Sequence, residues 1–101
     1  MSKHTILCVD DETSLLNSLQ RLLRREPYKL LLAKSAAEGL RQLAAEPIQL
    51  VISDQRMPGT TGIQFLQQVK DLYPDTVRVI LSGYADVGTI VEAINKGEVF
   101  R

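Results

Sequence analysis

Four polar side chains lie where phosphate or metal chemistry could be carried out. Asp10 and Asp11 follow one apolar run, Asp54 follows another, and Ser82 follows a third. Carboxylate oxygens are the hard ligands that Mg²⁺ prefers, and Mg²⁺ readily takes a phosphate oxygen as a further ligand. A carboxylate can also act as a covalent nucleophile toward a phosphoryl group. These residues predict a metal-organised phosphate site, with Asp54 as the nucleophile and Ser82 as a hydroxyl donor to a phosphoryl oxygen.

The elements that must position these residues follow the pattern of a parallel βαβ fold, in which short β-branched runs alternate with helical spacing. We expect strands at Thr5–Val9, Tyr28–Ala33, Leu50–Ser53 and Val77–Leu81. We expect helices at about 13–25, from Ser35 through Ala44, across the stretch from Ile63 to Leu72, and from Asp86 to about 95. The fold class is therefore α/β, with a doubly wound parallel sheet.

Three of these helices carry signals at their ends or along one side. Ser35 and Glu38 have the spacing of a capping box. Asp86 is expected to be the N-cap of the last helix. The apolar side of the third helix is expected to comprise Ile63, Phe65, Leu66, Val69 and Leu72.

The topology predicts where the acidic residues meet. In open α/β sheets, ligands bind outside the carboxyl ends of the strands, at the point where the strand order reverses. If the first and third strands are neighbours, then Asp10, Asp11 and Asp54 share one crevice. Their mutual repulsion would require a compensating cation, and Mg²⁺ is the natural one.

Composition limits the other possibilities. The 101 residues are enough for one domain, which we assign to 1–101. Twelve basic and twelve acidic residues cancel, so no global field favours nucleic acid or an anionic membrane. Cys8 is the only cysteine and is expected to be buried with a raised pKa. No signal sequence or apolar span is present, so we expect a soluble, cytoplasmic protein.

Three motifs, in order, carry a family resemblance. They are Val9-Asp10-Asp11-Glu12, Ser53-Asp54-Gln55-Arg56-Met57-Pro58-Gly59 and Ile80-Leu81-Ser82-Gly83-Tyr84. Together they resemble the receiver domains of two-component response regulators, which have the flavodoxin-like strand order 2-1-3-4-5. The resemblance spans nearly the whole chain.

The resemblance implies a role for each matching residue. Asp54 would accept a phosphoryl group from a sensor histidine kinase, and Ser82 would be the switch hydroxyl. Asp11, Asp54 and the backbone carbonyl of Arg56 would bind Mg²⁺ directly, and Asp10 would bind it through water. Arg56 and Tyr84 match positions that tune the lifetime of the phosphoryl group. Such a domain is a regulatory phosphoacceptor rather than an enzyme, with at most slow self-dephosphorylation.

The sequence departs from the family at its end. Receiver domains continue with a fifth strand, a Lys-Pro dipeptide and a last helix, whereas this sequence stops at Val99-Phe100-Arg101. The phosphate-binding lysine is therefore absent, and Val77–Leu81 would form an unpaired edge. We expect part of a longer regulator with a C-terminal effector domain, and the stretch 84–101 resembles receivers that precede HD-type cyclic-dinucleotide phosphodiesterases. A homodimer formed through the edge is the second explanation.

Two other functions fit parts of the pattern. A metal-dependent phosphatase of the haloacid dehalogenase kind also places a carboxylate after its first strand, but it would need an aspartate where Glu12 stands. A degenerate receiver that is not phosphorylated and acts as a protein-interaction module is the stronger alternative. Phosphoryl uptake separates it from the phosphoacceptor.

Overall fold

The fold confirms the predicted alternation of strands and helices. The computed structural model describes residues 4–12, 17–18, 20–21, 28–57, 59–81 and 85–95. In chain order the elements are β1 (His4–Val9), β2 (Tyr28–Ala33), α2 (Ala36–Ala45), β3 (Leu50–Asp54), α3 (Gly62–Leu72), β4 (Val77–Leu81) and α4 (Ala85–Asn95). Residues 17–18 and 20–21, the described part of the first expected helix, are helical. Within the described residues, no helix is long and apolar enough to span a membrane.

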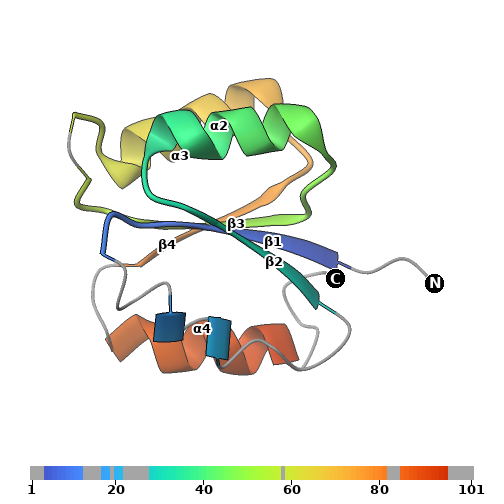
Figure 1. Cartoon of the computed structure of the whole chain (residues 1–101), viewed down its shortest axis with the longest axis vertical. Coiled ribbons are helices and arrows are strands. Elements are labelled where there is room, and N and C mark those ends of the chain that lie inside the picture. The colour runs from blue at the N-terminus through green and yellow to red at the C-terminus, as the bar shows by residue number, and fades with distance from the viewer. Residues whose placement is uncertain are drawn as a thin grey trace.

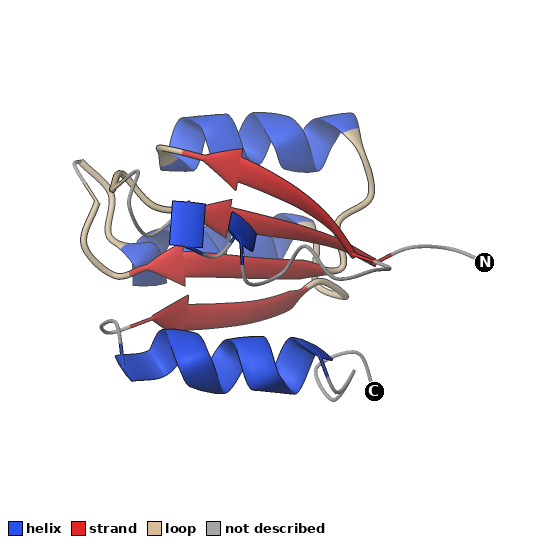
Figure 2. Ribbon diagram, turned by 60° about the horizontal axis from the view of Figure 1, so that its bottom comes forward, coloured by secondary structure: helices blue, strands red, loops and turns tan. Residues whose placement is uncertain are grey.

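The four strands form one parallel sheet in the order β2-β1-β3-β4, as predicted (Figure 2). β1 therefore lies between β2 and β3, so the strand order reverses at β1. The carboxyl ends of β1 and β3 lie side by side, with Val9 opposite Ser53. This register places the residues that follow β1 next to Asp54.

Alternate residues of the buried strands face opposite sides of the sheet. Leu7 and Val9 pack toward α2 and α3, in a cluster that includes Phe65 and Val69 of α3. Ile6 and Cys8 pack in a second cluster with residues of α4, namely Ile90, Val91 and Ile94. Figure 1 shows α2 and α3 on one face and α4 on the other. Continuous apolar runs suit strands that are covered on both faces.

The apolar side of α3 is narrower than we expected. Phe65 and Val69 are fully buried, but Ile63 and Leu72 are 61% and 62% exposed. Ile63 is displaced around the helix from the stripe that contains Phe65 and Val69, and Leu72 is the last residue of α3. The apolar residues that the sequence places on this helix therefore extend beyond its buried face, because helical spacing alone does not show how far the covered sheet extends.

The helix caps differ in part from the prediction. Ser35 is the N-cap of α2, and its Oγ accepts a hydrogen bond from the Glu38 N–H at 3.1 Å. The Glu38 carboxylate, however, accepts from the Lys34 N–H, so the capping box is only half formed as expected. Asp86 is not an N-cap, because α4 already begins at Ala85.

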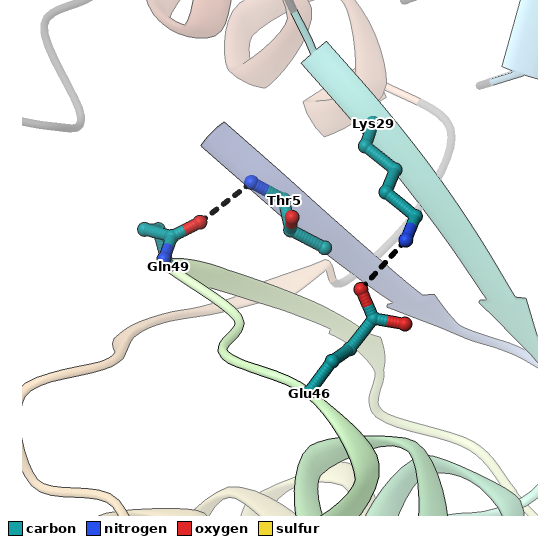
Figure 3. Close-up of polar contacts among 4 residues, drawn as sticks. All are labelled: Thr5, Lys29, Glu46 and Gln49. Carbon is teal, nitrogen blue, oxygen red and sulfur yellow. Dashed lines mark hydrogen bonds and ion pairs between the residues drawn. The ribbon is translucent and has the colours of Figure 1, made fainter. Parts of the chain in front are cut away.

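Polar contacts join the strands at their amino ends. Gln49 accepts the Thr5 N–H through Oε1 at 2.6 Å and donates its own N–H to the Thr5 carbonyl at 3.0 Å. Its carbonyl accepts the Val77 N–H at 3.0 Å, so Gln49 connects β1 to β4. Lys29 and Glu46 form an ion pair of 2.8 Å close by (Figure 3). At this end of the sheet, these donors and acceptors therefore pair with one another.

Candidate functional site

The three acidic residues meet at the carboxyl end of the sheet, as the sequence predicted. Asp10 and Asp11 follow β1, and Asp54 is the last residue of β3. One carboxylate oxygen from each of these residues lies within 4.8 Å of those from the other two. Since β1 and β3 are adjacent parallel strands, their ends deliver all three side chains to a single crevice.

Asp10 is the innermost member of the cluster. It is only 1% exposed, and its N–H donates to the Ala33 carbonyl at 3.0 Å, which ties it to the end of β2. Its Oδ1 accepts the Glu12 N–H at 2.8 Å. Asp11 is exposed beside it. The cluster therefore has a buried side and a side open to solvent.

Burial and neighbouring charge raise the pKa of Asp10 from 3.8 to about 6. Burial is the largest cause, and the negative charges of Asp54 and Asp11 add to it, whereas the Glu12 N–H lowers the pKa. Cys8 of β1 is also buried, and this burial is the main cause that raises the pKa of its thiol to about 12. The predicted inert core thiol is thus confirmed.

Asp54 is positioned by its backbone neighbours. The Arg56 N–H donates to Asp54 Oδ2 at 3.2 Å, and the Ser53 hydroxyl donates to the Asp54 carbonyl at 3.0 Å. Asp54 lies opposite Leu81 in the β3–β4 ladder, and the Gln55 N–H donates to the Leu81 carbonyl at 3.3 Å. This hydrogen bond therefore holds the end of β4 next to the crevice that contains Asp54.

The sequence reasoning missed the residues that hold the segment after Asp54. Gln55 accepts the Gly62 N–H through its carbonyl and the Ile63 N–H through Oε1, both at 3.0 Å. A Cβ on Gly62 would lie 2.2 Å from the Asp54 carbonyl oxygen, so only glycine fits there. Thr61 and Gln64 form a complete capping box at the start of α3. The three-residue spacing of Thr61 and Gln64 is the signal in the sequence that predicts this capping box.

Two predicted site residues, Ser82 and Tyr84, lie outside the described residues. Arg56 is described and is exposed beside Asp54. The structure therefore brings together Asp10, Asp11, Asp54 and Arg56 from the predicted set.

The donor set suits a hard divalent cation. Three carboxylates whose oxygens lie within 4.8 Å of one another are mutually repulsive, and the raised pKa of Asp10 records part of that repulsion. A cation that binds oxygen ligands would relieve it, and Mg²⁺ commonly binds through one or two carboxylates while it retains several waters. The residues present therefore fit Mg²⁺.

Comparisons with known proteins agree with this arrangement. A family model described as "Response regulator receiver domain" matches residues 6–99. The hydrogenase transcriptional regulatory protein HoxA of Cupriavidus necator is 38% identical over 97 residues, which is 96% of this chain and 20% of HoxA. This chain thus spans about a fifth of the length of HoxA, and also about a fifth of the transcriptional regulatory protein ZraR of Escherichia coli, which is 39% identical over 92 residues.

Solved structures show the same fold. The signal receiver domain of an HD domain-containing protein from Pseudomonas fluorescens Pf-5 has a TM-score of 0.79 and 38% identity, covering 100% of this chain and 74% of that one. A CheY-like receiver domain protein from Methanospirillum hungatei JF-1 has a TM-score of 0.77 and 32% identity, covering 95% and 77%. The chain belongs to the response regulator receiver domain family.

Proposed function

We propose that this chain accepts a phosphoryl group on Asp54, in a Mg²⁺-dependent reaction, and so controls an output domain of a longer protein. The observation that carries this proposal is the carboxylate cluster of Asp10, Asp11 and Asp54 at the end of β1 and β3. Family membership supports it, because receiver domains are regulatory modules of two-component systems. In this proposal residues 1–101 belong to one receiver domain.

In the proposed site, Asp11, Asp54 and the Arg56 carbonyl would hold Mg²⁺ directly, and Asp10 would hold it through water. When bound, Mg²⁺ supplies positive charge that neutralises the phosphoryl oxygens. The exposure of Asp11 supports its direct role, since an exposed carboxylate is open to an ion that enters from solvent, whereas Asp10 is buried behind it.

Asp54 is the nucleophile in the proposed transfer. The Arg56 N–H holds Oδ2, and the other carboxylate oxygen forms the bond to phosphorus. In the same step the bond from phosphorus to the kinase histidine nitrogen breaks, and its electron pair stays on that nitrogen. The product is an aspartyl phosphate, and catalysis comes mostly from positioning and charge neutralisation.

The response to phosphorylation is assigned by family position. Ser82 would bond a phosphoryl oxygen, and Arg56 and Tyr84 would set how long the phosphoryl group survives. To drive the domain from almost wholly off to almost wholly on, the phosphoryl group must favour one state by about 5.5 kcal/mol. The hydrogen bond from the Gln55 N–H to the Leu81 carbonyl supports a structural connection between Asp54 and the end of β4, where Ser82 follows.

The partners proposed are a sensor histidine kinase and a C-terminal effector domain, in the cytoplasm. The neighbours offer two kinds of output. One is an HD domain-containing protein and the other is a transcriptional regulator, and both are 38% identical to this chain. A transcriptional output has the broader support, because several curated relatives are transcriptional regulators, whereas one solved neighbour weakly suggests an HD-type output such as the phosphodiesterase.

Intact mass after incubation with acetyl phosphate tests the proposal. We expect the chain to gain one phosphoryl group with Mg²⁺ and none when the metal is chelated. Asp54→Asn should gain none, whereas Asp75→Asn, a change at an exposed aspartate before β4, should behave like the parent. Uptake by Asp54→Asn would remove Asp54 from its role, and no uptake by the parent would favour the interaction module.

A further inference from the structure

Gln55, the residue after Asp54, contacts the start of α3 at two points. Its carbonyl oxygen accepts the Gly62 N–H and its side-chain Oε1 accepts the Ile63 N–H, both at 3.0 Å. The first N–H groups of a helix have no partner within that helix. Gln55 therefore supplies the acceptors for the first two N–H groups of α3, whose N-cap is Thr61.

The peptide group between Gln55 and Arg56 is held from both sides. Its carbonyl accepts the Gly62 N–H at 3.0 Å, and its N–H, which is that of Arg56, donates to Asp54 Oδ2 at 3.2 Å. In a planar trans peptide the carbonyl and the N–H point in opposite directions. The hydrogen bond to α3 on one side therefore directs the N–H toward the Asp54 carboxylate on the other side.

The backbone around this peptide group is closely packed. The Gln55 N–H donates to the Leu81 carbonyl at 3.3 Å. A Cβ on Gly62 would lie 2.2 Å from the Asp54 carbonyl oxygen and 3.0 Å from the Gln55 Cα, so α3 begins directly against the end of β3. Of these contacts of Gln55, the Oε1 bond to Ile63 depends on the side chain, so a substitution can remove it and leave the backbone bonds in place.

We propose that Gln55 is a positioning residue for the nucleophile Asp54. Its side chain holds the Ile63 N–H, and this contact keeps the Gln55–Arg56 peptide in the orientation that bonds Asp54 Oδ2. With Oδ2 held, the other carboxylate oxygen remains for the bond to phosphorus. The catalytic consequence rests on the proposed function, whereas the positioning concerns hydrogen bonds that can be measured without a metal or a phosphoryl donor.

Gln64 of α3 provides a matched comparison. Its Oε1 accepts the Thr61 N–H at 3.0 Å, so it also caps the start of α3 through one side-chain hydrogen bond. That bond does not involve the Gln55–Arg56 peptide. Thr61 and Ile63 are both exposed, so water can replace either acceptor, and we expect both variants to fold. If Gln55 only capped the helix, loss of either glutamine would have the same consequence.

Amide hydrogen exchange of the protein without metal or phosphoryl donor, measured by NMR, tests the positioning. Gln55→Met removes the Oε1 acceptor and should speed exchange of the Arg56 amide by about threefold to tenfold, the equivalent of one lost hydrogen bond. Gln64→Met should leave the Arg56 amide at the parent rate. Gln55→Glu should do the same, because it keeps an acceptor oxygen and a carboxylate is favourable at the start of a helix.

An Arg56 amide that exchanges at the parent rate in Gln55→Met would overturn the positioning. Equal acceleration in Gln55→Met and Gln64→Met would also overturn it, because it would reduce Gln55 to a helix cap.

The rate of phosphoryl uptake tests the catalytic consequence. With Mg²⁺ and acetyl phosphate, intact mass followed over time should show uptake by Gln55→Met that is roughly tenfold slower than in the parent, since small misplacements of reacting groups cost rate steeply. Gln64→Met should keep the parent rate. Equal uptake by Gln55→Met and the parent would overturn the catalytic consequence. A parent that gains no phosphoryl group would contradict the proposed function instead, and the exchange of the Arg56 amide would still decide the positioning.

Discussion

The two ends of the sheet use their polar groups in opposite ways. At the amino end, Gln49 exchanges hydrogen bonds with Thr5, and Lys29 pairs with Glu46. At the carboxyl end, Asp10, Asp11 and Asp54 bring like charges together, and the pKa of Asp10 is raised to about 6. The amino end satisfies its own polar groups, while the carboxyl end holds three carboxylates whose repulsion a divalent cation would relieve.

This difference separates the end that stabilises the sheet from the end that carries the proposed function. Matched donors and acceptors at the amino end hold the strands in register without a ligand. The carboxyl end keeps an unfavourable charge arrangement that a divalent cation would relieve, so cation binding is coupled to stability there. Changes at the two ends should therefore differ in how they respond to Mg²⁺.

Gly62→Ala should have the largest effect. Its Cβ would lie 2.2 Å from the Asp54 carbonyl oxygen, so the start of α3 and the end of β3 must move apart. We expect a loss of more than about 3 kcal/mol in urea unfolding, together with loss of phosphoryl uptake. At Gly88 of α4 nothing lies within 4 Å of an added Cβ, so Gly88→Ala should stabilise by about 0.5–1 kcal/mol. Similar losses at both glycines would contradict the close approach.

Asp10→Asn should stabilise the metal-free protein at pH 7. The folded pKa of about 6 exceeds the ordinary 3.8, so the folded state favours the protonated acid and loses stability as pH rises from about 4 to 6. At about 1.4 kcal/mol per pKa unit, the upper limit of the gain is about 3 kcal/mol.

The pH profile of the unfolding free energy checks this sign. The difference between Asp10→Asn and the parent should be small at pH 4, should grow toward pH 7, and should shrink when Mg²⁺ is added. A difference that does not change with pH would mean that Asp10 carries no unfavourable charge in the folded protein.

Gln49→Ala should destabilise the amino end by about 1–2 kcal/mol, since the Thr5 N–H loses its acceptor. Gln49→Glu keeps an acceptor oxygen and should be closer to the parent. Neither change should alter Mg²⁺ affinity in calorimetry, because the carboxylates lie at the other end of the strands. A large change in Mg²⁺ affinity would show that the two ends are coupled.

Glu46→Gln should have the smallest effect, within about 0.5 kcal/mol. The ion pair with Lys29 is solvent-accessible, with side chains 52% and 32% exposed. Thermal unfolding at low and high salt would measure it, and any loss should vanish at high salt. A loss that persists in high salt would point to packing rather than charge.

The sequence predicted the strands and the meeting of the three carboxylates because buried parallel strands leave unbroken apolar runs, such as Ile6–Val9, that end at acidic residues. It could not show that Ile63 of α3 is exposed, since helical spacing does not reveal the extent of the neighbouring layer. It also could not place α4, which Tyr28 contacts across 66 residues of sequence. Long-range contacts of this kind leave no local pattern.

The most direct test of the phosphoacceptor site is to locate the phosphoryl group after reaction with acetyl phosphate and Mg²⁺. Borohydride reduces an acyl phosphate but not a free carboxylate, so it converts only the phosphorylated aspartate to homoserine. Peptide mass mapping should then find homoserine at position 54 alone, and none without Mg²⁺. Homoserine at position 10 or 11, or at no position, would contradict the assignment of Asp54 as the acceptor.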